Sequence, residues 1–375
     1  MVENGPVRLI EVATGVDPAP ALKYYQIWGR SLKTGEKQAP DADAGGCFLR
    51  IKVKYEEMKN IIKGLPLPAG GLMLGLAAAG NLTASHGIVC KVLSGTLSFV
   101  LLLLLLTKGV LAAGAVREDL KNPAIAGIAG TCPMGIMVLS GYVQPVFPGA
   151  GYLMWLAGIA LHCVLIIYFT RTFMPGFCLR NVLPSYFVVY VGIAAACLTA
   201  PAYNALGTGR VLFWFGFITY LILLPLLTYR ALVIKSIPEP LLPTLTIFAA
   251  PASLCLVGYL KLFPFVNMAI FWLLAILALI MLFAVLLYLP KLLRLKFYPS
   301  YSAFTFPLVI SAIALRDMDG FLSKISMGVP ALGYLANLAE ALAVVLVVYV
   351  LIRYAGFMFL QQVAPGPHKV HSVSK

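Results

Sequence analysis

Residues 269–289, AIFWLLAILALIMLFAVLLYL, contain no charged side chain and decide the class of fold. An apolar helix of this length rises about 1.5 Å per residue and crosses the roughly 30 Å hydrocarbon core of a bilayer. A second stretch, Leu101 to Leu106, consists of six consecutive leucines. Such segments predict an all-α polytopic membrane protein, since a soluble core of ordinary size does not bury them.

The composition of the whole chain agrees with this class. Of 375 residues, 61% are hydrophobic and 11% are charged, whereas a typical soluble domain has about 25% charged residues. The net charge of +14 does not predict a nucleic-acid partner, because basic residues in a membrane protein are first read as topology signals. The seven cysteines stand singly without a Cys-x-x-Cys pair, so no metal, cofactor or structural disulfide is predicted.

Apolar segments of membrane-spanning length recur along most of the chain. They divide it into a polar cytoplasmic N-terminal segment at 1–62, a ten-helix channel domain at 63–355 and a cytoplasmic C-terminal tail at 356–375. The ten predicted spans are 66–84, 92–113, 123–143, 150–170, 183–205, 210–231, 241–260, 265–289, 301–316 and 330–352.

The basic residues are distributed unequally between the two sides of these spans. The N-terminal segment and the segments after the even-numbered spans hold 23 of the 28 Lys and Arg residues, and those after the odd-numbered spans hold 5. The positive-inside rule therefore places both termini in the cytoplasm of a cell that carries the protein in its plasma or inner membrane.

The spans also repeat in pairs. The odd-numbered spans open near Pro66, Pro123, Pro184, Pro243 and Tyr301, and Trp155, Trp214 and Trp272 recur in three even-numbered spans at intervals of 59 and 58 residues. A two-helix unit crosses the membrane and returns, so all units have the same orientation. Five repeated helical hairpins are therefore predicted to pack around a central pore along the membrane normal.

Polar and helix-breaking residues concentrate in the odd-numbered spans, which we expect to lie inside. A proline within a helix frees a backbone carbonyl, and in lipid that group needs a neighbouring helix or a wet cavity. Alternatively, these prolines are ordinary kinks of membrane helices without a pore. The candidate pore-helix kinks are Pro133, Pro201, Pro251 and Pro307, and the candidate lining residues are Thr131, Thr199, Ser253 and Thr305.

Several of these segments resemble one known family. Pro66-Leu67-Pro68-Ala69-Gly70 and Tyr301-Ser302-Ala303-Phe304-Thr305-Phe306-Pro307 are similar to the first and ninth helices of the tellurite-resistance/dicarboxylate transporter (TDT) family, of the type of bacterial TehA and the plant slow anion channels. Pro184-Ser185-Tyr186 and Ala249-Ala250-Pro251-Ala252 are similar too. The resemblance covers about residues 65–355.

The resemblance implies a homotrimer in which each protomer has its own pore, closed by a phenylalanine of the ninth helix. The matching residue is Phe306, and a benzyl side chain in a narrow bore blocks water and ions by steric exclusion and dewetting. A packing role in the core is the alternative for this ring. The implied function is a channel for small monovalent anions such as chloride and nitrate.

A secondary carrier for C4-dicarboxylates, or for sulfite- or tellurite-related oxyanions, is the alternative function. Proton coupling of such a carrier needs a titratable group in the membrane, and Glu340 and His162 are the candidates. An enzyme is not predicted, because the chain lacks the His-Glu-x-x-His, Gly-x-Ser-x-Gly and Walker motifs. No motif identifies a regulatory partner or kinase.

Overall fold

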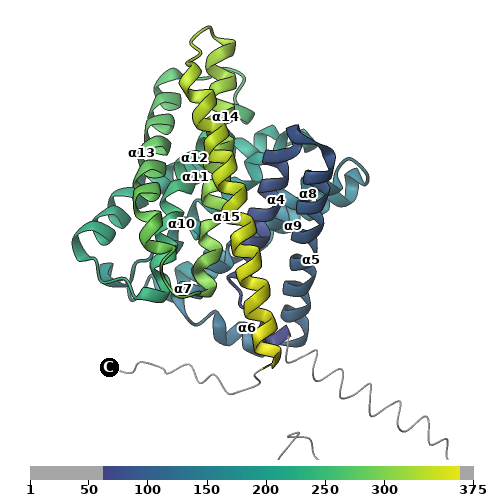
Figure 1. Ribbon diagram of the computed structural model, residues 1–375, viewed down its shortest axis with the longest axis vertical. Helices are drawn as coiled ribbons and strands as arrows, with labels where there is room; N and C mark the ends of the chain where they lie inside the picture. The colour runs from purple at the N-terminus through teal and green to yellow at the C-terminus, as the bar shows by residue number, and fades with distance from the viewer. Residues whose placement is uncertain (1–61, 364–375) are drawn as a thin grey trace, which may run out of the picture. The chain divides into compact units, whose positions relative to one another are not determined.

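The computed structural model describes residues 62–363, with side chains up to residue 359, and every regular element in this range is a helix (Figure 1). The all-α class predicted from the sequence is thereby confirmed. The predicted segment 1–62 lies outside the described residues except for its last position. Of the predicted tail, residues 364–375 lie outside them, and the earlier part continues the last helix.

Seven helices in the described range are long and apolar enough to cross a membrane. Two of the seven are formed by two successive helical segments, and another ends in a π-helical turn. The seven helices are α5 (Ile88–Leu111), α7 (Pro123–Ala129) with α8 (Thr131–Val143), α9 (Pro148–Phe173), α11 (Leu206–Tyr229) with η5 (Arg230–Ile234), η6 (Glu239–Ala249) with α12 (Ala250–Leu262), α13 (Met268–Leu292) and α15 (Pro330–Val363).

The other three predicted spans contain no helix that is both long and apolar enough to cross a membrane, so their crossing stays a prediction. The span predicted at 66–84 comprises α4 (Ala69–Leu82) and η1 (Thr83–His86), the one at 183–205 comprises α10 (Ser185–Tyr190), η3 (Gly192–Leu198) and η4 (Ala200–Tyr203), and the one at 301–316 comprises η7 (Pro299–Phe304) and α14 (Phe306–Lys324). Two short elements, α6 (Ala113–Asp119) and η2 (Leu179–Asn181), lie in connections.

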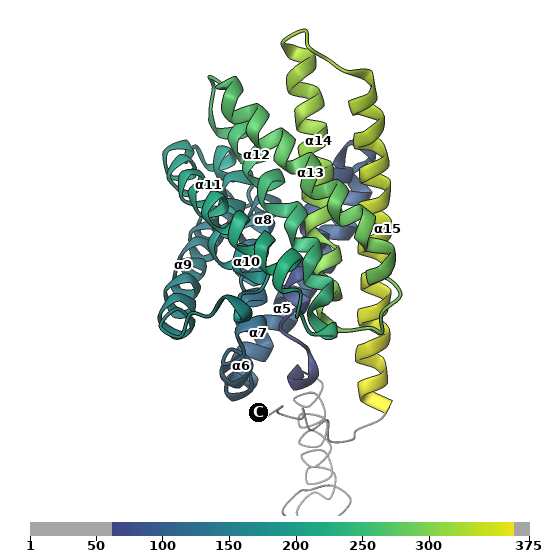
Figure 2. The same ribbon diagram turned by 90° about the vertical axis from the view of Figure 1, so that its left-hand side faces the viewer.

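Burial separates inner from outer helices. In the apolar windows of α7–α8 and of η6–α12, 78% and 83% of residues are buried, but only 22% are buried in α5 and α9 and 33% in α11, α13 and α15. Nearly all residues of α4 and α10 are buried as well. Outer helices expose large apolar side chains, as expected for a surface that faces lipid. Figure 2 shows that the outer helix α15 lies beside the shorter helix α14 and extends beyond it at its C-terminal end.

The inner segments are interrupted, and the predicted kink prolines lie at or near these interruptions. Pro251 and Pro307 occupy the first turns of α12 and α14, and Pro133 is the third residue of α8. In a first turn the missing proline N–H has no acceptor within the helix to lose. Pro201 lies in the short segment η4. Pro133, Pro251 and Pro307 thus lie in the first turn of a helical segment, next to an interruption.

Side-chain hydrogen bonds tie together the chain segments at one end of the helices. We term this end, at which α5, α9, α11 and α13 terminate, the basic end. The bonds link Lys108 to Asp119, Tyr168 to the Leu120 carbonyl, Arg230 to the Arg180 carbonyl, Tyr298 to Glu239, and Tyr354 to the Pro299 carbonyl.

Candidate pore site

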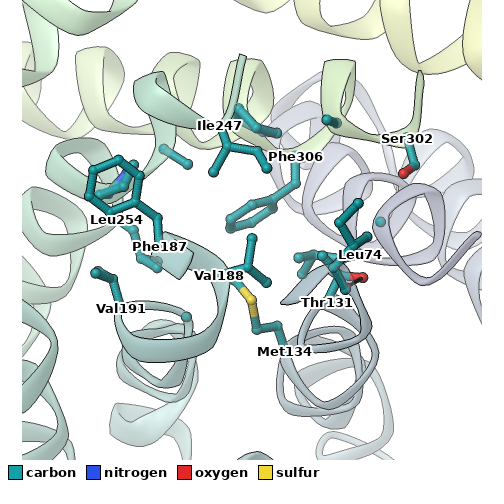
Figure 3. A pocket seen from close by; sticks show the side chains of 17 residues that line it. Leu74, Thr131, Met134, Phe187, Val188, Val191, Ile247, Leu254, Ser302 and Phe306 are labelled. Atoms are coloured by element: carbon teal, nitrogen blue, oxygen red, sulfur yellow. Dashed lines mark hydrogen bonds between the residues drawn. The ribbon is translucent and has the colours of Figure 1, made fainter. Parts of the chain in front are cut away.

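A cavity lies where five inner segments meet (Figure 3). These inner segments are α4, α7–α8, α10–η3, η6–α12 and η7–α14. Its empty volume is about 530 Å³, including the space at its openings. Each inner segment contributes two to four lining residues, whereas the outer helices of the described range contribute none. The lining residues are Gly71, Leu74, Ile128, Thr131, Met134, Phe187, Val188, Val191, Gly192, Ile247, Ala250, Pro251, Leu254, Ser302, Ala303, Phe306 and Pro307.

Lining residues recur at one position of the sequence repeat. Four prolines precede or open inner segments, and Pro243 lies within η6. Pro299 takes the place of Tyr301 as the fifth reference point. The residue eight positions after each proline lines the cavity, so equivalent positions of the five segments face one common space. From Pro66, Pro123, Pro184, Pro243 and Pro299, this rule selects Leu74, Thr131, Gly192, Pro251 and Pro307.

The cavity wall is almost entirely apolar. Of the 17 lining residues, none is charged and only Thr131 and Ser302 carry a polar side chain. The Thr131 hydroxyl donates to the carbonyl oxygen of Ile128, 2.8 Å away in the preceding helical turn. An ion in this cavity would lose hydrating water and gain no charged group in exchange, so dehydration sets its barrier.

The ring of Phe306 projects into this cavity. In Figure 3 it lies in the middle of the space, between Ile247 and Val188, which come from two other inner segments. Phe306 is the first residue of α14 and is only 4% exposed. The side chain expected from the family resemblance to close a pore thus occupies the space between the inner helices.

The backbone beside Phe306 is held by Thr305. This residue separates η7 from α14 with φ −88° and ψ −84°, outside the helical region. Its hydroxyl lies 2.9 Å from the carbonyl oxygen of Gly71 in α4 and 2.7 Å from that of Ser302, with both as acceptors. A Cβ added to Gly75 would overlap the Thr305 side chain. Close contact with α4 therefore fixes the position from which the Phe306 ring projects.

Of the four candidate lining residues, only Thr131 lines the cavity. The hydroxyls of the other three donate to backbone carbonyls between the helices or within one. Thr199 donates to Met137 at 3.1 Å, Ser253 to Ala249 at 2.9 Å, and Thr305 to Gly71 and Ser302. Among the candidate kink prolines, Pro251 and Pro307 line the cavity, whereas Pro133 and Pro201 do not.

One of these hydroxyls belongs to a small buried network at the break between η6 and α12. Ser253 and Ser311 both donate to the carbonyl oxygen of Ala249, and their own oxygens lie 3.2 Å apart. Ala249 is the last residue of η6, where the change of helix geometry disturbs the regular backbone bonding. The hydroxyls satisfy a carbonyl at the break.

Glu340 lies far along the chain from the cavity residues and pairs with two side chains from other elements. Its carboxylate forms an ion pair with Arg316 of α14 and lies 2.9 Å from Nε2 of His86 in η1. Arg316 also donates to the carbonyl oxygen of Leu82 at the end of α4. We term Glu340, Arg316 and His86 the Glu340 cluster. It joins α15, α14 and the end of α4, and none of its members lines the cavity.

His162 is fully buried on α9 behind the cavity wall. Its Nε2 lies 3.0 Å from the carbonyl oxygen of Val189, and its Nδ1 has no hydrogen-bond partner among the described residues. A Cβ added to Gly192 would lie 3.1 Å from the His162 ring. Because Gly192 lines the cavity and His162 does not, the ring packs one layer behind the wall.

Comparison with known proteins gives one match over most of the chain. A family model described as a voltage-dependent anion channel, SLAC1, matches residues 64–355. This range includes every inner segment and the whole cavity lining. No curated protein sequence matches the chain.

Proposed function

The chain belongs to the voltage-dependent anion channel (SLAC1) family, and from this premise we propose that it is a channel for small monovalent anions such as chloride and nitrate. In this proposal Phe306 closes the pore. The observation that carries it is the phenyl ring of Phe306 in the middle of an uncharged cavity between the inner helices. The family predicted from the sequence is confirmed, and with it membrane-bound anion transport or conduction.

The proposed architecture is ten spans, arranged as five hairpins around the pore. The lining residue that recurs eight positions after five regularly spaced prolines supports this arrangement. The basic end faces the cytoplasm in the proposal, together with both termini, since it holds most of the basic residues. The homotrimer and the location in the cell membrane rest on family resemblance.

Closure by Phe306 follows from the size and polarity of the space. The ring lies mainly among apolar side chains, so the surrounding bore has few groups that would hold water in place of bulk solvent. The hydrogen bonds of Thr305 to Gly71 and Ser302 hold the backbone next to Phe306 in place, so the ring stays in the cavity. Opening then requires a rotation of the ring or a separation of α14 from its neighbours.

The neutral wall also determines the proposed selectivity. The guanidinium of Arg316 is paired with Glu340 and does not line the cavity, so no fixed positive charge holds an anion there. We therefore expect weak selectivity among monovalent anions, with those that dehydrate easily, such as nitrate, passing more readily than chloride.

Reversal potentials test this function. Full-length Phe306→Ala protein, purified and inserted into planar bilayers with a potassium chloride gradient, should give a reversal potential close to the chloride equilibrium potential. Replacement of chloride by nitrate on one side should shift the potential in the direction of higher nitrate permeability. A reversal potential near that of potassium would contradict an anion channel.

A proton-coupled carrier for dicarboxylates or for sulfite- or tellurite-related oxyanions is the alternative. It requires a titratable group that the substrate path reaches. Glu340 is engaged by Arg316 and His86, and His162 lies behind the wall. These positions support a channel over a carrier built on either residue.

A further inference from the structure

Four basic residues lie at the basic end. Lys291 lies in the last turn of α13, Arg294 and Lys296 follow the end of this helix, and Arg353 lies on α15. All four side chains are exposed. The ion pairs of the described residues involve other cations, namely His86, Lys108, Lys121 and Arg316. We term Lys291, Arg294, Lys296 and Arg353 the Arg353 site.

The guanidinium of Arg353 is held between two aromatic rings. Its central carbon lies 5.5 Å from the ring centroid of Phe297 and 5.9 Å from that of Tyr349. Cation–π contacts of this kind restrict the side chain, while its N–H groups bond to no acceptor among the described residues. A guanidinium that is fixed in place and still has free donors is prepared to bind an anion.

The segment that carries Arg294 and Lys296 is also fixed. The Tyr301 hydroxyl donates to the Leu295 carbonyl at 2.7 Å, and the Tyr354 hydroxyl donates to the Pro299 carbonyl. Phe297 packs edge-on against Tyr354, with 5.4 Å between ring centroids. Since Tyr354 follows Arg353 on α15, these contacts hold the backbone of the segment that carries Arg294 and Lys296 against α15.

The Arg353 site adjoins apolar surfaces of two membrane-spanning helices. Leu287, one turn before Lys291 on α13, is 82% exposed, and Ile352, next to Arg353 on α15, is 64% exposed. Exposed aliphatic side chains of spanning helices face acyl chains, and the basic residues that follow lie at the level of the headgroups. The carboxylate of Glu239 accepts the Tyr298 hydroxyl at 2.9 Å and is the only acid bonded to the segment 293–299 in the described range.

We propose that the Arg353 site binds the phosphate of an anionic glycerophospholipid in the leaflet at the basic end. Arg353 donates paired N–H groups to the phosphate oxygens, and Lys291, Arg294 and Lys296 add positive charge around the headgroup. The acyl chains lie along the exposed faces of α13 and α15. This site is separate from the cavity, and its existence does not depend on which anion the pore conducts.

Lipid titration of the purified full-length chain in detergent tests the proposal. The probes are dioctanoyl phosphatidylglycerol, dioctanoyl phosphatidylcholine and inorganic phosphate, and the readouts are bound lipid by native mass spectrometry and the shift of the melting temperature. Each basic residue at an anionic surface contributes about fivefold to binding. Hence Arg353→Gln with Lys296→Gln should weaken phosphatidylglycerol binding by about 25-fold.

Arg171→Gln is the matched control, because Arg171 is exposed and lies at the basic end on α9. It should leave phosphatidylglycerol binding within about twofold of the unsubstituted protein, since one distant charge acts only through screened solvent. If the double variant melts at a lower temperature without lipid, the lipid-dependent shift still reports the site. Equal weakening by Arg171→Gln, equal binding of phosphatidylcholine, or displacement of the lipid by millimolar phosphate would overturn the proposal.

Discussion

The cavity and the Glu340 cluster use polar groups in opposite ways. The cavity, at the centre of the inner helices, has no charged side chain in its wall, whereas the Glu340 cluster brings three ionisable side chains together from α15, α14 and η1. Glu340 is 6% exposed and yet is fully engaged. This difference indicates that the charged side chains of the Glu340 cluster join helices away from the cavity, whereas neutral side chains enclose the cavity itself.

Loss of the Glu340 charge should lower the stability of the protein strongly. Glu340→Gln removes the anion that compensates Arg316, and we expect it to lower the free energy of unfolding by about 2 kcal/mol, less than for a fully buried pair because Arg316 is partly exposed. Glu118→Gln is the control, since Glu118 pairs with Lys121 on the surface and should contribute less than about 0.5 kcal/mol. Thermal unfolding in detergent measures both.

The same variant separates the structural cluster from a proton-coupled path. If Glu340 only joins helices, anion flux into proteoliposomes per folded protein should be unchanged by Glu340→Gln, with or without a proton gradient. Selective loss of the flux that depends on the proton gradient, in protein that is folded, would contradict the division between the two regions.

Replacement of glycine by alanine should change the free energy of unfolding in opposite directions at two positions, Gly75 and Gly109. Gly75→Ala places a methyl group against Thr305, and we expect a loss of about 1–3 kcal/mol from overpacking, together with a leak of anions as the Phe306 ring is displaced. Gly109, within α5, has no heavy atom within 4 Å of an added Cβ. Gly109→Ala should therefore stabilise the helix by up to about 1 kcal/mol. Destabilisation of equal size at both sites would contradict a close contact at Gly75.

Removal of the Thr305 hydroxyl should lower the free energy of unfolding by a smaller amount. Thr305→Val keeps the shape of the side chain but removes the buried hydroxyl bonds to Gly71 and Ser302, at a cost of about 1–2 kcal/mol. In the control, Thr107→Val, an exposed bond to Leu103 in α5 is lost, and the cost should stay below about 0.5 kcal/mol. Denaturant unfolding compares the two variants, and equal costs would show that Thr305 does not anchor the helix break.

The sequence predicts the outer helices better than the inner ones. Uninterrupted apolar stretches such as 269–289 identify α13 because hydropathy alone determines their partition into lipid. Three inner spans are divided by breaks at positions such as Thr305, where contacts with α4 override local helix propensity. Hydropathy does not contain those contacts, so the sequence predicts kinks at prolines such as Pro307 but does not predict where the helical segments end.

The candidate site was predicted in part for the same reason. Phe306 was identified by family resemblance, and its ring lies in the cavity; its role in closing the pore stays a prediction. Hydroxyls were expected in the lining, but Thr199, Ser253 and Thr305 bond to carbonyls instead. Aliphatic lining residues such as Leu74 give no local signal, since they resemble lipid-facing residues. The recurrence eight positions after the prolines is the pattern that identifies some of them.

Phe306 and Phe304 offer the most direct test of a pore closed by one side chain. Both rings are buried, but Phe304 packs against Tyr301, 4.8 Å between centroids, and does not line the cavity. Currents from purified protein in bilayers should rise on the order of tenfold for Phe306→Ala, equivalent to a barrier lowered by about 1.4 kcal/mol, and should not rise for Phe304→Ala. Equal currents from both variants, or silence from Phe306→Ala in protein that remains folded, would contradict the account.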